Sequence, residues 1–569
     1  MKKMFAGLLV LVLFTTTSYA ANPIRIDVSP SESLSNQNVI AAFKKAATYK
    51  GKPVEINFKR GTYRLSRAES VQKLYYISNT TSEVEDADPT KHIGLHLENL
   101  ENVTVNGNGS TFMMTGKMTS FIVDNCKNIV LKNMNFDYEY PTQTEIEVIE
   151  EGEKYIKAKV HPTSQYRIKD GVLEWYGEGW SYTQGIAQAY DYKSDITWRT
   201  WSPLNKLVKT TELEPNLLLM EYTEKPKAGV GLVYQMRDAI RDEVCGFIHK
   251  SSQVLLEDIN YYYLGNFGIV GQYSSDISFN RNRFAPELGS GRTNAGFADF
   301  IQISGCKGLI DIQNSYFAGA HDDPINIHGT HLQVTEFIND KELKVKFMHH
   351  QSYGFDAFFK GDDVEFIDRE SLISQEANKV VAVERINGRE IKLTLKNKIS
   401  TDVLNNKSLV VENVTWTPEV NIVNNYFGRI PSRGLLVTTR RKVNVENNTF
   451  YAMQMSGILI ADDAMSWYES GMAKDVTIHN NTFIDCKSPI IFIQPENRVD
   501  KGYVHSNIRI ENNTFKGVDG TVVSAKSVLG LDILDNLIIL NKEMKEDDIF
   551  SLKQVKDVKV VNNRIETNK

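Results

Sequence analysis

A short motif that recurs along the chain constrains its fold more than any other feature. Each copy is a run of alternating apolar and polar residues, then an Asn-rich corner, and then, in all but the last, an aromatic residue. The copies end at Phe136, Phe284, Phe317, Phe427, Phe450, Phe483, Phe515 and Ile565. Close neighbours are 23 residues apart (427 to 450) or 32 to 33 residues apart (284 to 317, 450 to 483, 483 to 515). Such periods, with several short strands each and no helical segments between copies, predict a parallel β-helix.

The Asn residues of this motif are expected to have a structural role. They recur at one phase of the repeat, as in "VNIVNNYF", "VNVENNTF" and "VTIHNNTF". Asn tolerates the left-handed backbone conformation that a tight corner requires. In a solenoid its side chain can also hydrogen-bond to its counterparts in the coils above and below. We therefore predict an Asn ladder, rather than glycosylation, for the motifs that read Asn-x-Thr.

Two segments interrupt the repeat and predict inserted domains. From about 140 to 242, and again from about 329 to 415, longer alternating strands such as "EIEVIEEGEKYIKAKVH" and "EIKLTLKN" replace the Asn corners. Both are typical of antiparallel β domains, in the form of small barrels. The first insert carries Trp175, Trp180, Trp198 and Trp201, which a barrel core explains better than sugar contacts do.

The expected segments follow from these breaks. They are 1–20 (signal peptide), 21–139 (N-terminal cap and first coils), 140–242 (first insert), 243–328 (coils with the candidate catalytic residues), 329–415 (second insert) and 416–569 (last coils).

The N-terminal region predicts an export signal followed by a cap. Lys2 and Lys3 precede a short apolar run at 5–14, and a small-residue cleavage site lies at 18–20. The apolar run is too short to span a bilayer, and no later segment approaches the required length. We therefore expect an exported bacterial protein, periplasmic or extracellular, without a membrane span. Residues 39–47 carry an apolar stripe, which predicts a helix that closes the open end of the β-helix.

Charge and cysteine content argue against several classes of protein. The formal net charge is −6, and without Lys2 and Lys3 it becomes −8, since 63 basic residues then face 71 acidic ones. A mildly acidic, well-mixed surface argues against nucleic acid as a partner. The cysteines lie far apart without a CxxC pair, so neither a zinc site nor a disulfide framework is indicated. They are expected to be free residues of the core: Cys126, Cys245, Cys306 and Cys486.

Carboxylates gather in one part of the predicted solenoid. The stretch "GAHDDPINIH" sets Asp322 and Asp323 directly before a β-like alternation. Aligning "ADFIQIS" with "DDPINIH" by their inward-facing isoleucines puts Asp299 one coil below Asp323, 24 residues earlier. Neighbouring strands are about 4.8 Å apart, so the three carboxylates should share one edge of two coils. "RGLLV" continues the column with Arg433, and "SGILI" continues it with Ser456.

Such a cluster predicts one of two kinds of site. Stacked carboxyl groups raise one another's pKa, so one of them can hold a proton near neutral pH. A protonated carboxyl beside an ionised one is what a glycosidase uses, the first for the leaving oxygen and the second for water. The competing interpretation is a calcium site or solvated turn acids, and local spacing alone does not choose between them. Export, and the lack of any cofactor-binding motif, favour hydrolysis of a polysaccharide or glycan over other chemistry.

Longer stretches carry a family resemblance. "GFADFIQIS", "GAHDDPINIHG", the "NNTF" coils, the two inserts, "VEINFKRGTYRL" and "RDAIRDE" together resemble the exported α-1,3-galactosidases of glycoside hydrolase family 110. The resemblance covers essentially the whole mature chain. It implies an all-β fold: a right-handed parallel β-helix of the pectate-lyase-like kind with two inserted antiparallel β domains.

The resemblance also implies an activity. It predicts exo-acting, metal-independent removal of terminal α-1,3-linked galactose from galactose-terminated glycans, of the blood group B type or linear, with inversion at the anomeric carbon. In that family an Asp at the phase of Asp299 and a pair matching Asp322 and Asp323 form the catalytic centre. We expect Asp299 to be the general acid, because nearby negative charge favours its protonated form, and one or both of the pair to activate water.

Other residues near the column are candidates for substrate binding: Arg433, Arg237, Asp238, Arg241 and His328. Arg237, Asp238 and Arg241 could equally form a solvated salt-bridge cluster. Two alternative functions remain at this point. A polygalacturonase-like pectin hydrolase shares the Asp pair followed by alternating apolar residues, but the Gly-His-Gly and Arg-Ile-Lys stretches of that family are missing downstream. A glycan-binding β-helix without catalysis is the other.

Overall fold

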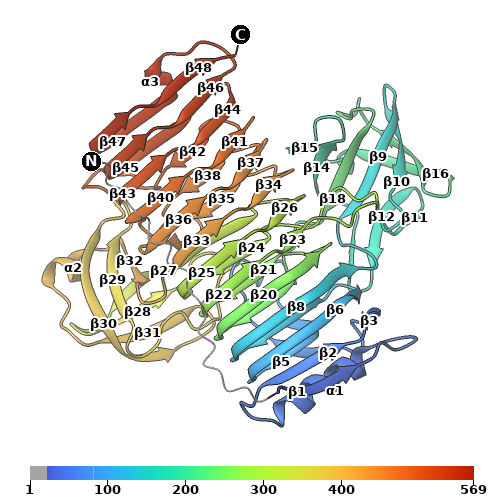
Figure 1. Cartoon of the computed structure of the whole chain (residues 1–569), viewed down its shortest axis with the longest axis horizontal. Helices are drawn as coiled ribbons and strands as arrows, with labels where there is room; N and C mark the ends of the chain where they lie inside the picture. The colour runs from blue at the N-terminus through green and yellow to red at the C-terminus, as the bar shows by residue number, and fades with distance from the viewer. Residues whose placement is uncertain (1–21, 81, 569) are drawn as a thin grey trace, which may run out of the picture.

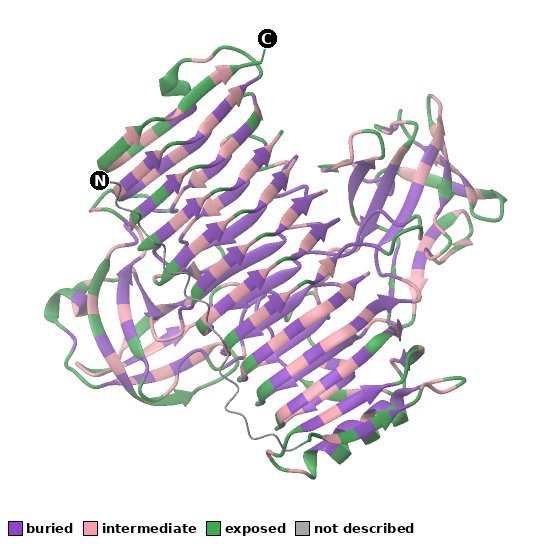
Figure 2. Cartoon of the chain, viewed as in Figure 1, coloured by how far each residue is buried: buried purple, intermediate pink, exposed green. Residues whose placement is uncertain are grey.

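The chain winds into a parallel β-helix that carries two inserts on its sides (Figure 1). The structure is a computed structural model that describes residues 22–80 and 82–568. Each coil contributes strands to three columns of hydrogen-bonded parallel strands, and their inward side chains form one continuous apolar core. Figure 2 shows buried and partly exposed residues alternating along the solenoid strands, as the two-residue period of a strand requires.

Two of the three columns carry the repeat motif. The first column contains β1 (Ile24–Val28), β2 (Val54–Phe58), β6 (Glu101–Thr115), β8 (Lys127–Tyr138), β20 (Ser252–Tyr261), β22 (Ser275–Asn280), β25 (Lys307–Gln313), β33 (Glu419–Val423), β36 (Lys442–Glu446), β40 (Asp475–His479), β43 (His505–Glu511), β45 (Val523–Leu534) and β47 (Phe550–Val561). The second contains β3 (Thr62–Ser66), the C-terminal parts of β6, β8 and β20, β23 (Arg283–Phe284), β26 (Tyr316–Ala318), β34 (Tyr426–Gly428), β37 (Thr449–Tyr451), β41 (Thr482–Ile484), β44 (Thr514–Val518), β46 (Leu537–Leu540) and β48 (Arg564–Thr567).

The third column carries the candidate site. It contains β5 (Thr90–Glu98), β7 (Thr119–Asp124), β19 (Gly246–His249), β21 (Ile269–Gln272), β24 (Ile301–Ser304), β27 (Ile325–Phe337), β35 (Leu435–Val437), β38 (Ile458–Ile460) and β42 (Ile491–Ile493), which pairs with the start of β45.

The repeat motif forms two ladders between the first and second columns. The side-chain amide nitrogens of Asn425, Asn448, Asn481, Asn513 and Asn536 each donate to the amide oxygen of the next Asn along the ladder, over 2.8–3.1 Å. The Asn before several of them has a positive φ, 58° at Asn424 and 56° at Asn480. The motif phenylalanines stack inside the core from Phe284 to Phe515, with ring centroids 4.7–5.0 Å apart. The predicted ladder is confirmed.

A helix covers the N-terminal end of the solenoid, as the apolar stripe predicts. It is α1 (Asn36–Ala47), and it packs against β1, β2, β3 and β5. The buried face of α1 includes Val39, Phe43 and Ala46. The helix begins three residues before the apolar stripe, because Asn36 is held in place: its Nδ2 donates to the Ser66 carbonyl, and its Oδ1 accepts from the Ser66 backbone nitrogen.

The first insert consists of two antiparallel sheets around one core. A seven-stranded sheet has the order β15-β14-β18-β9-β10-β17-β16, and a three-stranded sheet has the order β11-β12-β13. Their bounds are β9 (Thr144–Glu151), β10 (Tyr155–Val160), β11 (Tyr166–Lys169), β12 (Val172–Gly177), β13 (Trp180–Tyr182), β14 (Ile186–Asp191), β15 (Ile196–Thr200), β16 (Leu207–Glu214), β17 (Leu217–Tyr222) and β18 (Leu232–Arg237). Trp175 and Trp180 are buried in this core, and Trp198 and Trp201 pack against it, so the core interpretation of these tryptophans is confirmed.

The second insert is a closed barrel. Its antiparallel pairings run in a ring, β27-β28-β31-β30-β29-β32 and back to β27. The bounds are β28 (Glu342–Lys346), β29 (Asp363–Asp368), β30 (Ser374–Arg385), β31 (Glu390–Leu395), α2 (Thr401–Asn405) and β32 (Leu409–Asn413).

The two inserts flank the third column. The first insert lies in the chain between β8, which ends in the second column, and β19 of the third column. The second insert lies between β27 of the third column and β33 of the first column. The first therefore stands at the corner where strands of the third column begin, and the second at the corner where they end. The face between them is where a site can be enclosed.

The predicted all-β solenoid with two antiparallel inserts is confirmed. All four cysteines are free and buried. No helix within 22–80 and 82–568 is long and apolar enough to cross a membrane. The predicted signal peptide at 1–20 lies outside the described residues, and the exact limits of the expected segments stay a prediction.

Candidate active site

The expected column of charged residues lies at the start of the third-column strands. Ile301 pairs with Ile325, and Ile325 pairs with Leu435, so Asp299, Asp323 and Arg433 occupy one position in three successive coils. The backbone nitrogen of Phe300 donates to the Asp323 carbonyl over 3.1 Å, which extends the pairing to the column itself. The apolar alternation therefore gave the correct register.

Asp322 is held by arginines from two elements. Its Oδ1 accepts from Arg199 of β15 at 3.0 Å, and its Oδ2 accepts from Arg241 at 3.2 Å. The Ser432 hydroxyl also donates to Oδ1, at 3.0 Å. Burial alone would raise the pKa of Asp322, but the positive charges of Arg241, Arg199 and Arg433 outweigh burial and lower it. Asp322 is therefore ionised near neutral pH.

Asp323 lies deeper and is bound more completely. Arg433 donates from Nε to Oδ1 at 2.9 Å and from Nη2 to Oδ2 at 2.7 Å, a bidentate pair. Oδ1 also accepts from the Arg433 backbone nitrogen and the Ser432 hydroxyl. The Asp323 side chain is only 2% exposed. Burial and the charge of Asp322 raise its pKa, although Arg433 opposes them.

Asp299 has a different environment from the pair. It is buried, and no group in the described part of the chain donates a hydrogen bond to its carboxyl group. Burial, followed by the charges of Asp322 and Asp323, raises its pKa well above the ordinary value, although Arg241 opposes them. Asp299 therefore holds a proton where Asp322 does not.

An open pocket of about 270 Å³ lies over these groups. Asp299, Asp322 and Asp323 line one side of it together with Arg199, Arg241 and Arg433. The floor is the outward face of β27, β35 and β38, which presents Asn326, Leu436 and Leu459. The far wall comes from the loop after β38 and includes Trp467 and Glu469.

The pocket combines residues that lie far apart in the chain. Asn79 donates to Glu469 at 2.8 Å across the far wall, and Arg199 belongs to the first insert. Sequence reasoning missed Asn79, Arg199, Asn326, Trp467 and Glu469. Of these only Asn326 carried a signal, since the strand alternation that turns Ile325 and Ile327 inward turns Asn326 outward.

Three of the predicted substrate-binding residues lie behind the pocket instead of lining it. Arg237 is buried and stacks on Phe297, with its guanidinium carbon 4.3 Å from the ring centroid. Burial raises the pKa of Asp238 to about 6. His328 is buried as well, and its Nδ1 lies 2.7 Å from the Gly329 carbonyl oxygen.

Arg241 and Arg433 do line the pocket, as predicted, and both contact the Asp pair. The alternative of a solvated salt-bridge cluster is wrong, because Arg237 and Arg241 are largely shielded from solvent.

The arrangement contains one carboxyl group that can donate a proton, Asp299, and one carboxylate that can accept a proton, Asp322. A neutral carboxyl and an ionised one face the same pocket, and the pair of environments that separates their pKa values is the usual sign of an acid and a base. Asp299 and Asp322 line the same pocket, and after burial the charge of Asp322 is the largest cause of the raised pKa of Asp299. Room for a water molecule between acid and base is what an inverting glycosidase needs.

Comparison with known families agrees with this architecture. The model of the GLAA-B beta-barrel domain I matches residues 143–233, and that of the GLAA-B beta-barrel domain II matches residues 342–407. The model of the right handed beta helix region matches residues 377–532.

Three relatives align with nearly the whole chain. Alpha-1,3-galactosidase A of Bacteroides thetaiotaomicron is 56% identical over 95% of this chain and 96% of its own length. The protein of the same name from Bacteroides fragilis is 40% identical over 85% and 81%. The one from Streptomyces avermitilis is 36% identical over 94% and 91%. With this identity over its full length and both barrel domains matched, the chain belongs to the α-1,3-galactosidase family, glycoside hydrolase family 110.

Proposed function

We propose that this protein is an exo-acting glycoside hydrolase that removes terminal α-1,3-linked galactose from glycans with inversion at the anomeric carbon. The observation that carries the proposal is the contrast within one pocket between Asp299, whose pKa burial raises, and Asp322, held ionised by two arginines. The relatives that align over nearly the whole chain carry the name of this activity. Its substrates are galactose-terminated oligosaccharides or glycoconjugates.

Each carboxyl has a role that its environment favours. Asp299 donates its proton to the leaving oxygen, and Asp322 accepts a proton from the attacking water on the opposite face of the sugar. Asp323 and Arg433 keep Asp322 in place through the shared Ser432 hydroxyl. Since both reacting groups belong to the chain itself, the proposal needs no metal or cofactor.

The stereochemical course is tested by proton NMR of the first sugar released. An inverting enzyme releases β-galactose from galactosyl-α-1,3-galactose. Initial release of α-galactose would contradict inversion and would make one of the Asp pair a nucleophile. Parallel incubations with the fucose-branched blood group B trisaccharide and with polygalacturonate define the substrate. Cleavage of polygalacturonate alone would sink the proposal in favour of a pectin hydrolase, and cleavage of none would favour a glycan-binding protein.

The acid is tested through the leaving group. Asp299→Asn should reduce kcat/KM on the disaccharide by about a hundredfold or more, but much less on an aryl α-galactoside whose leaving group needs no proton. Asp322→Asn should impair both substrates alike, because water must be activated in either case. If Asp322→Asn instead spares the aryl substrate, the acid and base have been exchanged in our assignment.

The export signal that the sequence predicts at residues 1–20 supports a location outside the cytoplasm. We propose a periplasmic or extracellular enzyme, and fractionation of cells that express the full chain tests the placement.

A further inference from the structure

The floor of the pocket offers room for one sugar ring beside the carboxylates. Asp323 lies just before β27 and Asn326 is the second residue of that strand, three positions later, so at most roughly 10 Å of chain separates them. The far wall with Trp467 stands beyond Asn326, at the corner where the second insert begins. The pocket of about 270 Å³ between the acids and this wall is large enough for a single hexose.

Asn326 on the pocket floor has a buried side chain with an unsatisfied amide oxygen among the described residues. It is only 5% exposed, and its Oδ1 has no hydrogen-bond partner in the described part of the chain. Its neighbours in the adjacent coils are Gln302 and Leu436, and the Leu436 side chain has no polar atom to offer. A buried amide oxygen that accepts no hydrogen bond is unfavourable, and a ligand that donates to it removes that cost. The side-chain amide can turn over to present either its donor or its acceptor, and a sugar hydroxyl pairs with both.

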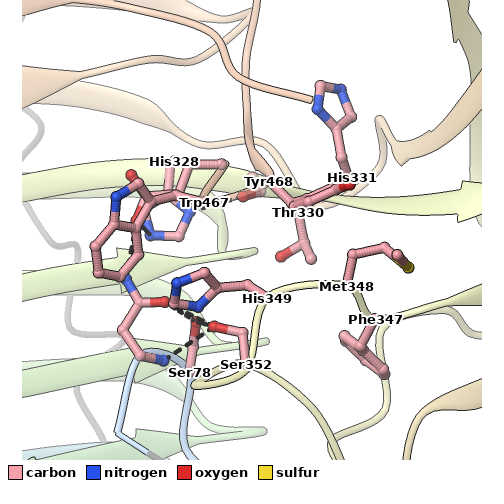
Figure 3. Close-up of a pocket in the computed structure, with 13 residues that line it drawn as sticks. Ser78, His328, Thr330, His331, Phe347, Met348, His349, Ser352, Trp467 and Tyr468 are labelled. Atoms are coloured by element: carbon pink, nitrogen blue, oxygen red, sulfur yellow. Dashed lines mark hydrogen bonds and ion pairs between the residues drawn. The ribbon is translucent and has the colours of Figure 1, made fainter. Parts of the chain in front are cut away.

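Trp467 is fixed from two sides, and one face stays open. The Asp463 carboxylate accepts hydrogen bonds from the backbone nitrogens of four residues that follow it: Met465, Ser466, Trp467 and Tyr468. These hydrogen bonds fix the conformation of the loop that carries the indole. Behind it, His349 of the second insert stacks on the indole with ring centroids 4.2 Å apart (Figure 3). Trp467 nevertheless remains 40% exposed.

We propose that Asn326 and Trp467 form the subsite for the terminal galactose, with His349 as a positioning residue behind Trp467. The Asn326 amide hydrogen-bonds to a ring hydroxyl, and the indole covers the face of the sugar that carries only C–H groups. A hexose has such an apolar face, and a rigid aromatic ring is suited to it. The inference rests on the proposed function, and it names the residues that bind the terminal galactose.

Kinetics on two substrates test the subsite. Trp467→Ala and Asn326→Ala should each raise KM about tenfold, on the aryl α-galactoside as well as on the disaccharide, because both substrates contain the terminal galactose. Trp467→Phe should retain most of the affinity, since it keeps an aromatic face. The matched control Asn444→Ala changes a half-buried outward Asn of β36 in the first column and should leave both KM values unchanged. If the alanine variants affect only the disaccharide, these residues bind the leaving sugar and the proposal is overturned.

Binding of the product separates this proposal from the activity. Galactose alone should quench the tryptophan fluorescence of the wild type, and Trp467→Phe should abolish the quench. This result does not require turnover. Galactose binding without hydrolysis of any α-galactoside would support the subsite and contradict the proposed function. Hydrolysis together with an unchanged quench in Trp467→Phe would support the proposed function and contradict the subsite.

His349 acts through Trp467, and its test uses a conservative variant. His349→Ala should raise KM and shift the indole emission with kcat little changed, because the ring loses its backing. His349→Phe should restore both, since a phenyl ring can stack in the same place. Equal behaviour of the two variants would show that stacking on Trp467 is irrelevant.

Discussion

At the scale of single residues, the adjacent acids are tolerated because each has its own set of donors. Asp323 forms an ion pair with Arg433. The two carboxylate oxygens of Asp322 accept hydrogen bonds from Arg199 and Arg241. Among the residues at 22–80 and 82–568, none donates a hydrogen bond to the Asp299 carboxyl, and its raised pKa keeps it neutral. The three neighbouring carboxyl groups are thus divided into one ion pair with arginine, one ionised base and one acid.

The Asp322 base should lose its low pKa when an arginine is removed. In the free enzyme the base must be ionised, so activity is present above its pKa and is lost as pH falls through it. Arg241 is the first of the charges that lower this pKa. In Arg241→Gln the pKa of Asp322 rises, and the acidic limb of the kcat/KM profile moves to higher pH. Activity should therefore fall more at pH 5 than at pH 7.

A control separates this effect from a general change of charge. Arg167 of the first insert is exposed, pairs with Glu174 at 2.6 Å and does not line the pocket. Arg167→Gln should leave the acidic limb where it is. An unmoved limb in Arg241→Gln would show that Asp322 is not the group whose ionisation controls activity.

At the scale of elements, the Asn ladder holds successive coils in register. Asn481 donates to the Asn513 amide oxygen and to the Val445 carbonyl, and it accepts from the backbone and side-chain nitrogens of Asn448. It is 1% exposed. Removing it leaves buried groups on both neighbouring coils without partners.

Asn481→Ala should therefore lower the free energy of unfolding by about 2–4 kcal/mol. Urea denaturation followed by circular dichroism measures the change. Thr477→Ala alters a half-buried outward side chain of the same coil and should change stability by less than about 0.5 kcal/mol. Comparable losses in the two variants would mean that the ladder adds nothing specific.

At the scale of the whole molecule, the sequence predicted the architecture, but it located site residues only where the repeat controls their register. The period-two alternation located Asp299, Asp323 and Arg433 in one column, because parallel coils keep the same register from one to the next. Arg199 and Trp467 could not be found in this way. Arg199 lies 123 positions before Asp322 in a domain without the repeat, and its reach depends on how that domain packs.

The limits of the repeat also explain why some predicted substrate-binding residues lie near the pocket without lining it. "RDAIRDE" is an irregular connection from the first insert back to the solenoid, so no alternation says which side chains face the pocket. Arg241 faces it, whereas Arg237 turns onto Phe297. His328 follows the alternation outward, but the loop that carries Trp467 covers it, and only the tertiary structure shows that cover (Figure 3).

The second insert matters for the whole molecule because it supplies the backing of Trp467, and one buried ion pair ties it to the solenoid. Arg440, which follows β35, contacts Glu412 of β32 and also Glu365 of β29 at 2.9 Å. The Arg440 and Glu412 side chains are 6% and 1% exposed. Arg440→Met should lower the free energy of unfolding by about 3–5 kcal/mol, because Glu412 stays buried without its partner. It should also raise KM, as His349 loses its fixed place.

The partner's charge, rather than the shape of the arginine, should account for most of this loss. The double variant Arg440→Met/Glu412→Gln removes both charges and should recover most of the stability. Burial raises the pKa of Glu412, but Arg440 outweighs burial and holds that pKa below the ordinary value of 4.5. Stability from the pair is therefore present above pH 4.5 and is lost as pH falls through the lowered value. Urea unfolding at neutral and acidic pH should show a steeper acid loss for the wild type than for the double variant. Equal slopes, or a single variant as stable as the wild type, would mean that the second insert is held by its apolar contacts alone.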